Sequence, residues 1–175
     1  MTRFKAWLSE NSDASVPQVL EELRAVQTMA SLRPAYRLVI FLGAAFSERF
    51  IKEGEVAKHK AALAALSASS IQQRQLIAAA EWLCGTRYSS QMKFFPVLLQ
   101  QFYEEDLVKE EVFFEWDADS LRSDMSVDAS MISDEALESL RSHAKPFLVW
   151  LQEAEEEDEE EGEDDDESGD AEEED

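Results

Sequence analysis

The chain has 175 residues, 39 of them acidic and 16 basic, and a formal net charge of −23. This length suits one domain of ordinary size, or one domain with a tail. An acidic excess this large argues against binding nucleic-acid backbones, where lysine and arginine must neutralise phosphates. The expected partners are basic proteins. Because Cys84 is the only cysteine, an internal disulfide and a cysteine-based zinc site are excluded.

The acidic residues are concentrated at the C-terminal end, where residues 153–175 contain 18 acidic residues and no basic one. Such a segment has nothing apolar to offset the entropy of ordering it, so we predict a disordered tail after a folded domain over residues 1–152. The N-terminus lacks the apolar segment of a signal peptide. The longest apolar run, residues 38–46, is far shorter than the roughly 20 residues that cross a bilayer. We expect a cytoplasmic protein without a membrane span.

The first half of the chain carries helix signals. Pro17 and Pro34 each stand where a first helical turn can begin, because proline there loses no needed N–H group. Apolar residues follow Pro34 at helical spacing, and Gly54 is expected to end that run. Ser70 with Gln73 predicts a capping box that opens the next helix.

The second half continues in the same way after Gly85, which is expected to end the preceding helix. We predict an apolar segment at 94–102, a short helix over 106–116, a polar connector over 117–133 and a last helix from near Ser133. Short connectors between amphipathic helices place neighbours antiparallel. The predicted fold class is therefore all-α: seven to nine helices in stacked antiparallel hairpins, a HEAT-like short α-solenoid with a disordered acidic C-terminal tail.

No pattern indicates catalysis. His59 and His143 lie in different predicted helices without an adjacent nucleophile, so both are interpreted as ordinary surface residues. Cys84 follows an apolar pair and is interpreted as a buried structural thiol. A glycine-rich phosphate loop, a zinc-protease motif and a nucleophile elbow are all missing from the sequence. We expect no enzyme activity, no cofactor and no metal.

Two stretches, residues 102–116 and 146–157, combine aromatic and acidic side chains. We expect the aromatic side chains to be mostly core, because a stripe at helical spacing is normally buried, and the acidic ones to form a functional surface. On a helix that begins at Asp106, the carboxylates of residues 104–106 would lie at the N-terminus, where the helix dipole favours negative charge.

These stretches resemble the paired aromatic/acidic boxes that close the C-terminal HEAT-type domain shared by eukaryotic translation initiation factor 5, the epsilon subunit of initiation factor 2B and their relatives. The sequence Glu111-Val-Phe-Phe-Glu-Trp116 and residues 145–157 are most similar to the factor 5 branch. The resemblance implies a monomeric adaptor that binds lysine-rich segments of initiation factor 2 beta and contacts initiation factors 1 and 3, assembling the preinitiation complex. The acidic positions it implies are Glu104, Glu105, Asp106, Glu110, Glu111, Glu115, Glu153, Glu155, Glu156 and Glu157, and the aromatic ones, for binding or structure, are Trp116, Phe147 and Trp150.

The chain departs from the family pattern in two respects. Asp117 follows Trp116 where relatives often carry another aromatic residue, which loosens the assignment of that helix end. The resemblance also implies that a GTPase-activating half, with an arginine finger and a four-cysteine zinc site, would lie N-terminal to this domain. One cysteine cannot make that zinc site, so we expect this chain not to stimulate GTP hydrolysis.

A basic region precedes the boxes. Between residues 24 and 74 there are eight basic and three acidic residues. A solvated helix surface is one interpretation. The other is a patch that binds an acidic partner, ribosomal RNA or the chain's own tail. The candidate basic residues are Arg33, Arg37, Arg49, Lys52, Lys58, Lys60 and Arg74.

Two other functions remain open at this point. The epsilon-type relatives imply a nucleotide-exchange domain that acts on the G protein of initiation factor 2. The acidic tail alone suggests a chaperone of basic proteins such as histones or ribosomal proteins. For the adaptor, the charge pattern favours electrostatic capture of a polylysine segment, which weakens steeply with salt.

Overall fold

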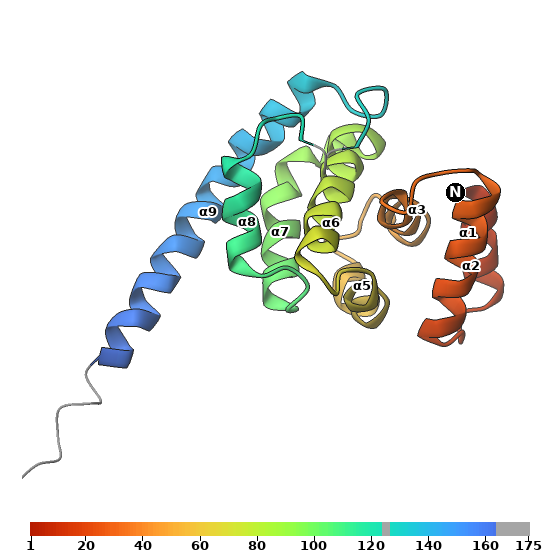
Figure 1. The fold of residues 1–175 in the computed structure, drawn as a ribbon, viewed down its shortest axis with the longest axis horizontal. Helices are drawn as coiled ribbons and strands as arrows, with labels where there is room; N and C mark the ends of the chain where they lie inside the picture. The colour runs from red at the N-terminus through yellow and green to blue at the C-terminus, as the bar shows by residue number, and fades with distance from the viewer. Residues whose placement is uncertain (124–126, 164–175) are drawn as a thin grey trace, which may run out of the picture.

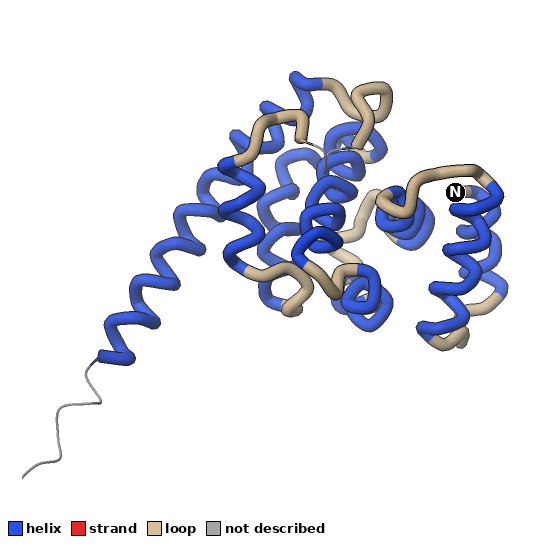
Figure 2. The backbone as a smooth tube through the Cα atoms, in the orientation of Figure 1, coloured by secondary structure: helices blue, strands red, loops and turns tan. Residues whose placement is uncertain are grey.

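The computed structural model describes residues 1–123 and 127–163, with side chains placed through Ala154. Within those ranges the chain is helical with no strand, and nine α-helices follow one another (Figures 1 and 2). This confirms the all-α prediction. None of the described helices is both long enough and apolar enough to cross a membrane.

The N-terminal end is a hairpin of α1 (Thr2–Glu10) and α2 (Val16–Met29), and both helices pack against α3 (Tyr36–Ala45). Helix α2 begins as predicted, with Pro17 in its first turn. The Ser15 amide donates to the Gln18 side chain at 2.9 Å. Phe4 of α1 is fully buried and lies 6.2 Å, between ring centroids, from Phe41 of α3. Helix α3 is therefore covered on one side by the hairpin.

The prediction for the run after Pro34 was wrong about where it ends. Helix α3 stops at Ala45, because the backbone of Phe46 is extended and turns its ring into the core beside Phe50. Gly54 instead occupies a left-handed position with φ of 61°, and it precedes α4 (Glu55–Lys58) and α5 (Lys60–Leu66). Glycine suits that backbone conformation because it carries no Cβ.

Helix α6 (Ser70–Trp82) opens with a capping box one residue earlier than predicted, made by Ser69 and Gln72. Gln73 instead accepts a hydrogen bond from the Lys109 amide at 3.0 Å. The helix continues into a π-helical turn, η1 (Leu83–Arg87), and a 3₁₀ segment, η2 (Ser89–Phe94).

Three helices close the C-terminal end: α7 (Phe95–Glu104), α8 (Glu110–Ala118) and α9 (Asp134–Glu163). Helix α9 packs against both α7 and α8, and α8 also packs against α6. In Figure 1, α9 extends past the body on the side opposite the α1–α2 hairpin. It begins where predicted but continues to Glu163, so the predicted domain boundary after Gln152 falls inside a helix. Residues 164–175 of the predicted tail lie outside the described residues.

The prediction of a helix from Asp106 was wrong, because α8 begins at Glu110. Asp106 has a φ of 57° and follows the last turn of α7, where the Leu107 amide donates to the Phe102 carbonyl at 2.8 Å. This is a left-handed cap at a helix C-terminus. Residues 104–106 therefore lie at the end of α7, where the helix dipole disfavours negative charge. The acids in the first turn of α8 are Glu110 and Glu111.

Candidate protein-binding surface

Two of the three predicted aromatic positions lie in the core. Trp116 is 2% exposed, and Phe147 is 5% exposed with its ring 5.0 Å from that of Phe113. Trp150 is 40% exposed. Its ring contacts Tyr103 of α7 at a centroid distance of 5.9 Å. Only Trp150 is accessible enough to contact a partner directly.

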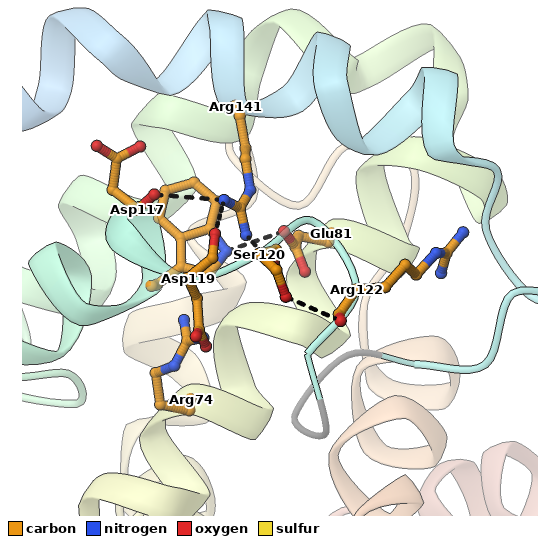
Figure 3. A network of polar contacts seen from close by, with 8 residues as sticks. Arg74, Glu81, Asp117, Asp119, Ser120, Arg122 and Arg141 are labelled. Carbon is orange, nitrogen blue, oxygen red and sulfur yellow. Dashed lines mark hydrogen bonds and ion pairs between the residues drawn. The ribbon is translucent and has the colours of Figure 1, made fainter.

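Trp116 is held by a buried polar network that the sequence did not reveal. Its indole Nε1–H donates to the carboxylate of Glu81, which is 3% exposed on α6 (Figure 3). Burial raises the pKa of Glu81, and the Trp116 hydrogen bond followed by Arg141 and Arg74 act in the opposite direction. The Arg141 guanidinium lies 5.2 Å from the Trp116 ring centroid. The one sequence signal was a lone carboxylate in the otherwise apolar run before Trp82.

Arg141 connects this network to the chain after α8. Its guanidinium donates to the backbone carbonyls of Asp119 at 2.7 Å and Ser120 at 3.3 Å (Figure 3). Arg74, assigned to the basic patch from sequence, is 7% exposed and pairs with Asp119 at 2.5 Å. Arg74 therefore fastens α6 to the end of α8 and is too buried to belong to a surface patch.

The predicted acidic positions form two groups at the C-terminal end. Glu104, Asp106, Glu111 and Glu115 are exposed around the α7–α8 corner and on α8, and Glu105 and Glu110 are half-buried there. Glu153 is exposed on α9. Some of these acids already interact within the chain: Glu105 pairs with Lys60 at 3.1 Å, Glu111 pairs with Lys109 at 3.8 Å, and Glu104 accepts a hydrogen bond from Gln100 at 2.9 Å. The positions Glu155, Glu156 and Glu157 belong to α9, but their side chains lie outside the described set.

Packing of α9 on α7 brings the two groups to the same end of the molecule. Trp150 contacts Tyr103, the residue before Glu104, and Glu153 follows Trp150 by about one helical turn. The start of α7 lies beside Pro146 and Phe147, so the two helices run in the same direction along this contact. The second acidic group therefore continues past the α7–α8 corner that carries the first.

A small apolar depression lies next to Trp150. It has a volume of about 260 Å³ and is lined by Pro96, Val97 and Gln100 of α7 and by Pro146, Phe147 and Trp150 of α9. Val97 is 36% exposed at its edge. The acidic end thus presents carboxylates together with exposed apolar surface.

The predicted basic patch is largely occupied by contacts within the chain. Arg33 pairs with Asp128, Arg49 with Glu53, and Lys60 with Glu105. The Arg37 Nε donates to Gln27 at 3.1 Å. The hydrogen bond with Tyr36 and the charge of Asp128 raise the pKa of Arg33. Within the described residues, Arg37, Lys52 and Lys58 are the candidates that have no ion pair.

The other titratable candidates are structural. Cys84 is fully buried, and burial raises the pKa of its thiol to about 12, so it is unreactive at neutral pH. His143 is exposed as predicted. The prediction that His59 is a surface residue was wrong, since its ring lies half-buried against Phe41 and Phe46. Among the described residues, no group of three or more His, Cys, Asp or Glu side chains is placed to hold a metal ion.

Residues 72–161 match a protein-family model described as W2: eIF4-gamma/eIF5/eIF2-epsilon. The chain belongs to the W2 family. The matched range runs through α6 to α9 and contains every predicted acidic and aromatic position, together with Glu81 and Arg141. The family resemblance inferred from the two boxes is thereby confirmed.

Individual relatives agree with this assignment. The W2 chain is 25% identical over 159 residues to "Probable eukaryotic translation initiation factor 5" of Schizosaccharomyces pombe. This alignment covers 89% of this chain and 36% of the yeast protein. The W2 chain is also 31% identical over 84 residues to "Eukaryotic translation initiation factor 5" of Mus musculus, covering 48% of this chain and 18% of the mouse protein. It therefore spans well under half the length of these relatives.

A solved structure extends the likeness beyond the matched range. The structure described as "The C-terminal Domain of Translation Initiation Factor 5 at low pH" superposes with a TM-score of 0.65 at 26% identity, and the match covers 92% of this chain and 95% of that one. The N-terminal helices before residue 72 are thus part of the same fold. The W2 chain is a relative of translation initiation factor domains over nearly its whole length.

Proposed function

We propose that this W2 domain is a non-enzymatic adaptor of translation initiation that binds lysine-rich segments of initiation factor 2 beta through its acidic end. By the same family relationship it contacts initiation factors 1 and 3 in the cytoplasm and so helps to assemble the preinitiation complex. The observation that supports this most directly is the position of the two acidic groups. They flank the exposed Trp150 at one end of the molecule.

The binding mechanism is electrostatic capture. A flexible lysine-rich segment is attracted to the exposed carboxylates of Glu104, Glu111, Glu115 and Glu153 and associates quickly. Each exposed ion pair contributes only about 0.2–1 kcal/mol, so affinity requires many of them. Lysines of the partner also replace Lys60 and Lys109 as partners of their carboxylates. The sequence after Gln152 contributes 18 acidic residues to this capture, Glu153 included.

Titration of a synthetic lysine-rich peptide that reproduces the initiation factor 2 beta segments tests this function. The peptide is added to the whole chain and to a chain ending at Gln152, each at low and high salt. We expect binding that weakens steeply with salt, because the Debye length falls to about 8 Å near physiological ionic strength. We also expect weaker binding that persists in the shortened chain. Binding that is unchanged at high salt contradicts the electrostatic mechanism.

The two alternative functions, acidic chaperone and nucleotide exchange, predict different experimental results for the same chain. If binding disappears with residues 153–175, the acidic-chaperone function is favoured, since the folded acidic groups then contribute nothing. The family description also names eIF2-epsilon, so a nucleotide-exchange role is the second alternative. Faster GDP release from the G protein of initiation factor 2 in the presence of this chain would establish exchange.

A further inference from the structure

A large cavity lies at the opposite end of the described residues from the acidic boxes. It has a volume of about 630 Å³ and opens between the α1–α2 hairpin, the end of α3 and the start of α5. We call it the N-terminal cavity. Its apolar wall is formed by Leu8, Val19, Ala44, Phe46 and Ala62. Ligand pockets of about 300–1,000 Å³ hold groups larger than one side chain, and this cavity falls in that range.

The lining of the N-terminal cavity is basic, although the chain as a whole is strongly acidic. Lys5 and Lys58 line it, and no carboxylate does. Both lysines are exposed, and neither has an ion pair in the described part of the chain. The neighbouring Glu55 is 5% exposed, and its carboxylate accepts the Ser47 amide hydrogen bond at 2.7 Å. Burial raises the pKa of this carboxyl, and the charge of Lys58 has a smaller effect in the opposite direction. Because neither lysine is held in an ion pair, both ammonium groups are available to an anionic ligand.

We propose that the N-terminal cavity binds a short acidic segment of a partner protein that carries an apolar side chain. The apolar side chain fills the wall formed by Leu8, Val19 and Phe46, and the flanking carboxylates pair with Lys5 and Lys58. His59 lines the same cavity, and burial followed by the charge of Lys58 lowers the pKa of its imidazole. At neutral pH it adds a hydrogen-bonding group without charge.

The chain's own acidic tail does not match this site. Residues 153–175 contain no apolar side chain larger than alanine, so they cannot fill the cavity wall. Helix α9 also points away from the α1–α2 hairpin (Figure 1). A nucleic-acid strand matches poorly as well, since two lysines neutralise few phosphates and the net charge of −23 repels the rest.

This site is separate from the function proposed above, because it uses the other end of the molecule and charge of the opposite sign. A domain with a carboxylate surface at one end and a lysine-lined cavity at the other can hold a basic segment and an acidic segment at the same time. The two sites share no residue, so either can be correct without the other.

The test uses the whole chain labelled with ¹⁵N and a synthetic peptide of Asp and Glu that carries Leu and Phe one helical turn apart. The variant Lys5→Glu/Lys58→Glu reverses the two cavity lysines. The matched control, Lys52→Glu/Lys93→Glu, makes the same change in net charge at exposed lysines outside the cavity. A second peptide replaces Leu and Phe by Ser. The lysine-rich peptide described above checks that the acidic end of each variant is intact.

We expect the amide signals of Leu8, Phe46 and Ala61 to shift with the acidic-apolar peptide. The cavity variant should bind that peptide about tenfold more weakly, whereas the control variant should bind it nearly as well as the unchanged chain. The Ser peptide should bind much more weakly. The proposal is overturned if the shifts lie outside the cavity, if both variants weaken binding equally, or if the Ser peptide binds as tightly. The same shifts produced by single-stranded RNA would also overturn it.

Discussion

At the scale of single residues, the decisive feature is that Trp116 is an anchor of the core. Its indole N–H donates a buried hydrogen bond to the carboxylate of Glu81, at a distance of 2.9 Å. A buried carboxylate is costly unless it is paired and hydrogen-bonded, and Arg141 and Arg74 supply the positive charge. An aromatic residue that the family resemblance marks for binding or structure thus has a structural role in this chain.

Glu81 makes the stability of the domain depend on pH. Burial raises the pKa of its carboxyl above the ordinary value of 4.5, so between pH 4.5 and that raised pKa the folded chain holds a proton that the unfolded chain has lost. Its contribution to stability is therefore full below pH 4.5 and is lost as the pH rises through the folded pKa. In the variant Glu81→Gln, the amide oxygen still accepts the Trp116 hydrogen bond but the side chain does not titrate. As the pH rises, we expect the free energy of unfolding of the unchanged chain to fall relative to this variant, by at most about 1.4 kcal/mol per pH unit.

Urea unfolding of both chains across this pH range measures the effect. The many exposed carboxylates titrate in both proteins, so the difference between the two curves isolates Glu81. A difference that stays flat, or that rises with pH, would mean that Glu81 does not carry a raised pKa.

At the scale of elements, Gly85 lets η1 pack closely against α9 and the residues just before it. A Cβ on Gly85 would lie 2.6 Å from Ile132 Cδ1 and 3.1 Å from Leu140 Cδ1, too near for either atom to stay in place. The sequence interpretation of Gly85 as the end of a helix missed this reason, because Ile132 lies far along the chain. Packing favours glycine here, since the two neighbouring side chains occupy the space that a Cβ would need and would have to shift to admit one.

We expect Gly85→Ala to destabilise the domain by about 1–3 kcal/mol through overpacking. Ile132→Val removes the Cδ1 atom that the new methyl would meet. The double variant Gly85→Ala/Ile132→Val should therefore be less destabilised than the sum of the two single variants. Thermal or urea unfolding of all four chains gives the coupling energy, and simple additivity would contradict the proposed contact.

At the scale of the whole molecule, charge is divided between two ends. The acidic groups meet where α9 passes the α7–α8 corner, and the lysine-lined cavity lies by the α1–α2 hairpin (Figure 1). If only net charge mattered, every surface carboxylate would contribute equally to binding a basic segment. The arrangement of the helices instead concentrates the carboxylates that a basic segment can contact together.

Charge-reversal variants can distinguish binding by carboxylates at the acidic end from attraction by the net charge of the chain. Glu104→Lys/Glu153→Lys should weaken binding of the lysine-rich peptide about tenfold, because it removes two contacts and adds repulsion at the acidic end. Glu135→Lys/Glu138→Lys makes the same change in net charge at exposed residues in the first turns of α9 that are not among the predicted acidic positions. Calorimetric titration of both variants gives the comparison, and equal losses would assign binding to net charge alone.

Much of the fold was predictable because helices are specified locally. Apolar spacing, Pro17 and the region of the α6 capping box predicted where helices lie, and the start of α9 was correct. The errors fall at helix ends. The start of α8 was misplaced because Asp106 adopts a left-handed backbone to cap α7, which an acidic run does not reveal.

The sequence by itself determined that this protein is helical, acidic at its C-terminal end and related to initiation-factor domains, because composition, periodicity and short motifs carry that information along the chain. The tertiary structure alone decided that Trp116 is buried while Trp150 is exposed, that Arg74 is an internal anchor, and that the two acidic groups share one end. Each of these depends on contacts between residues far apart in sequence, such as Trp116 with Glu81, and such contacts exist only once the helices have packed.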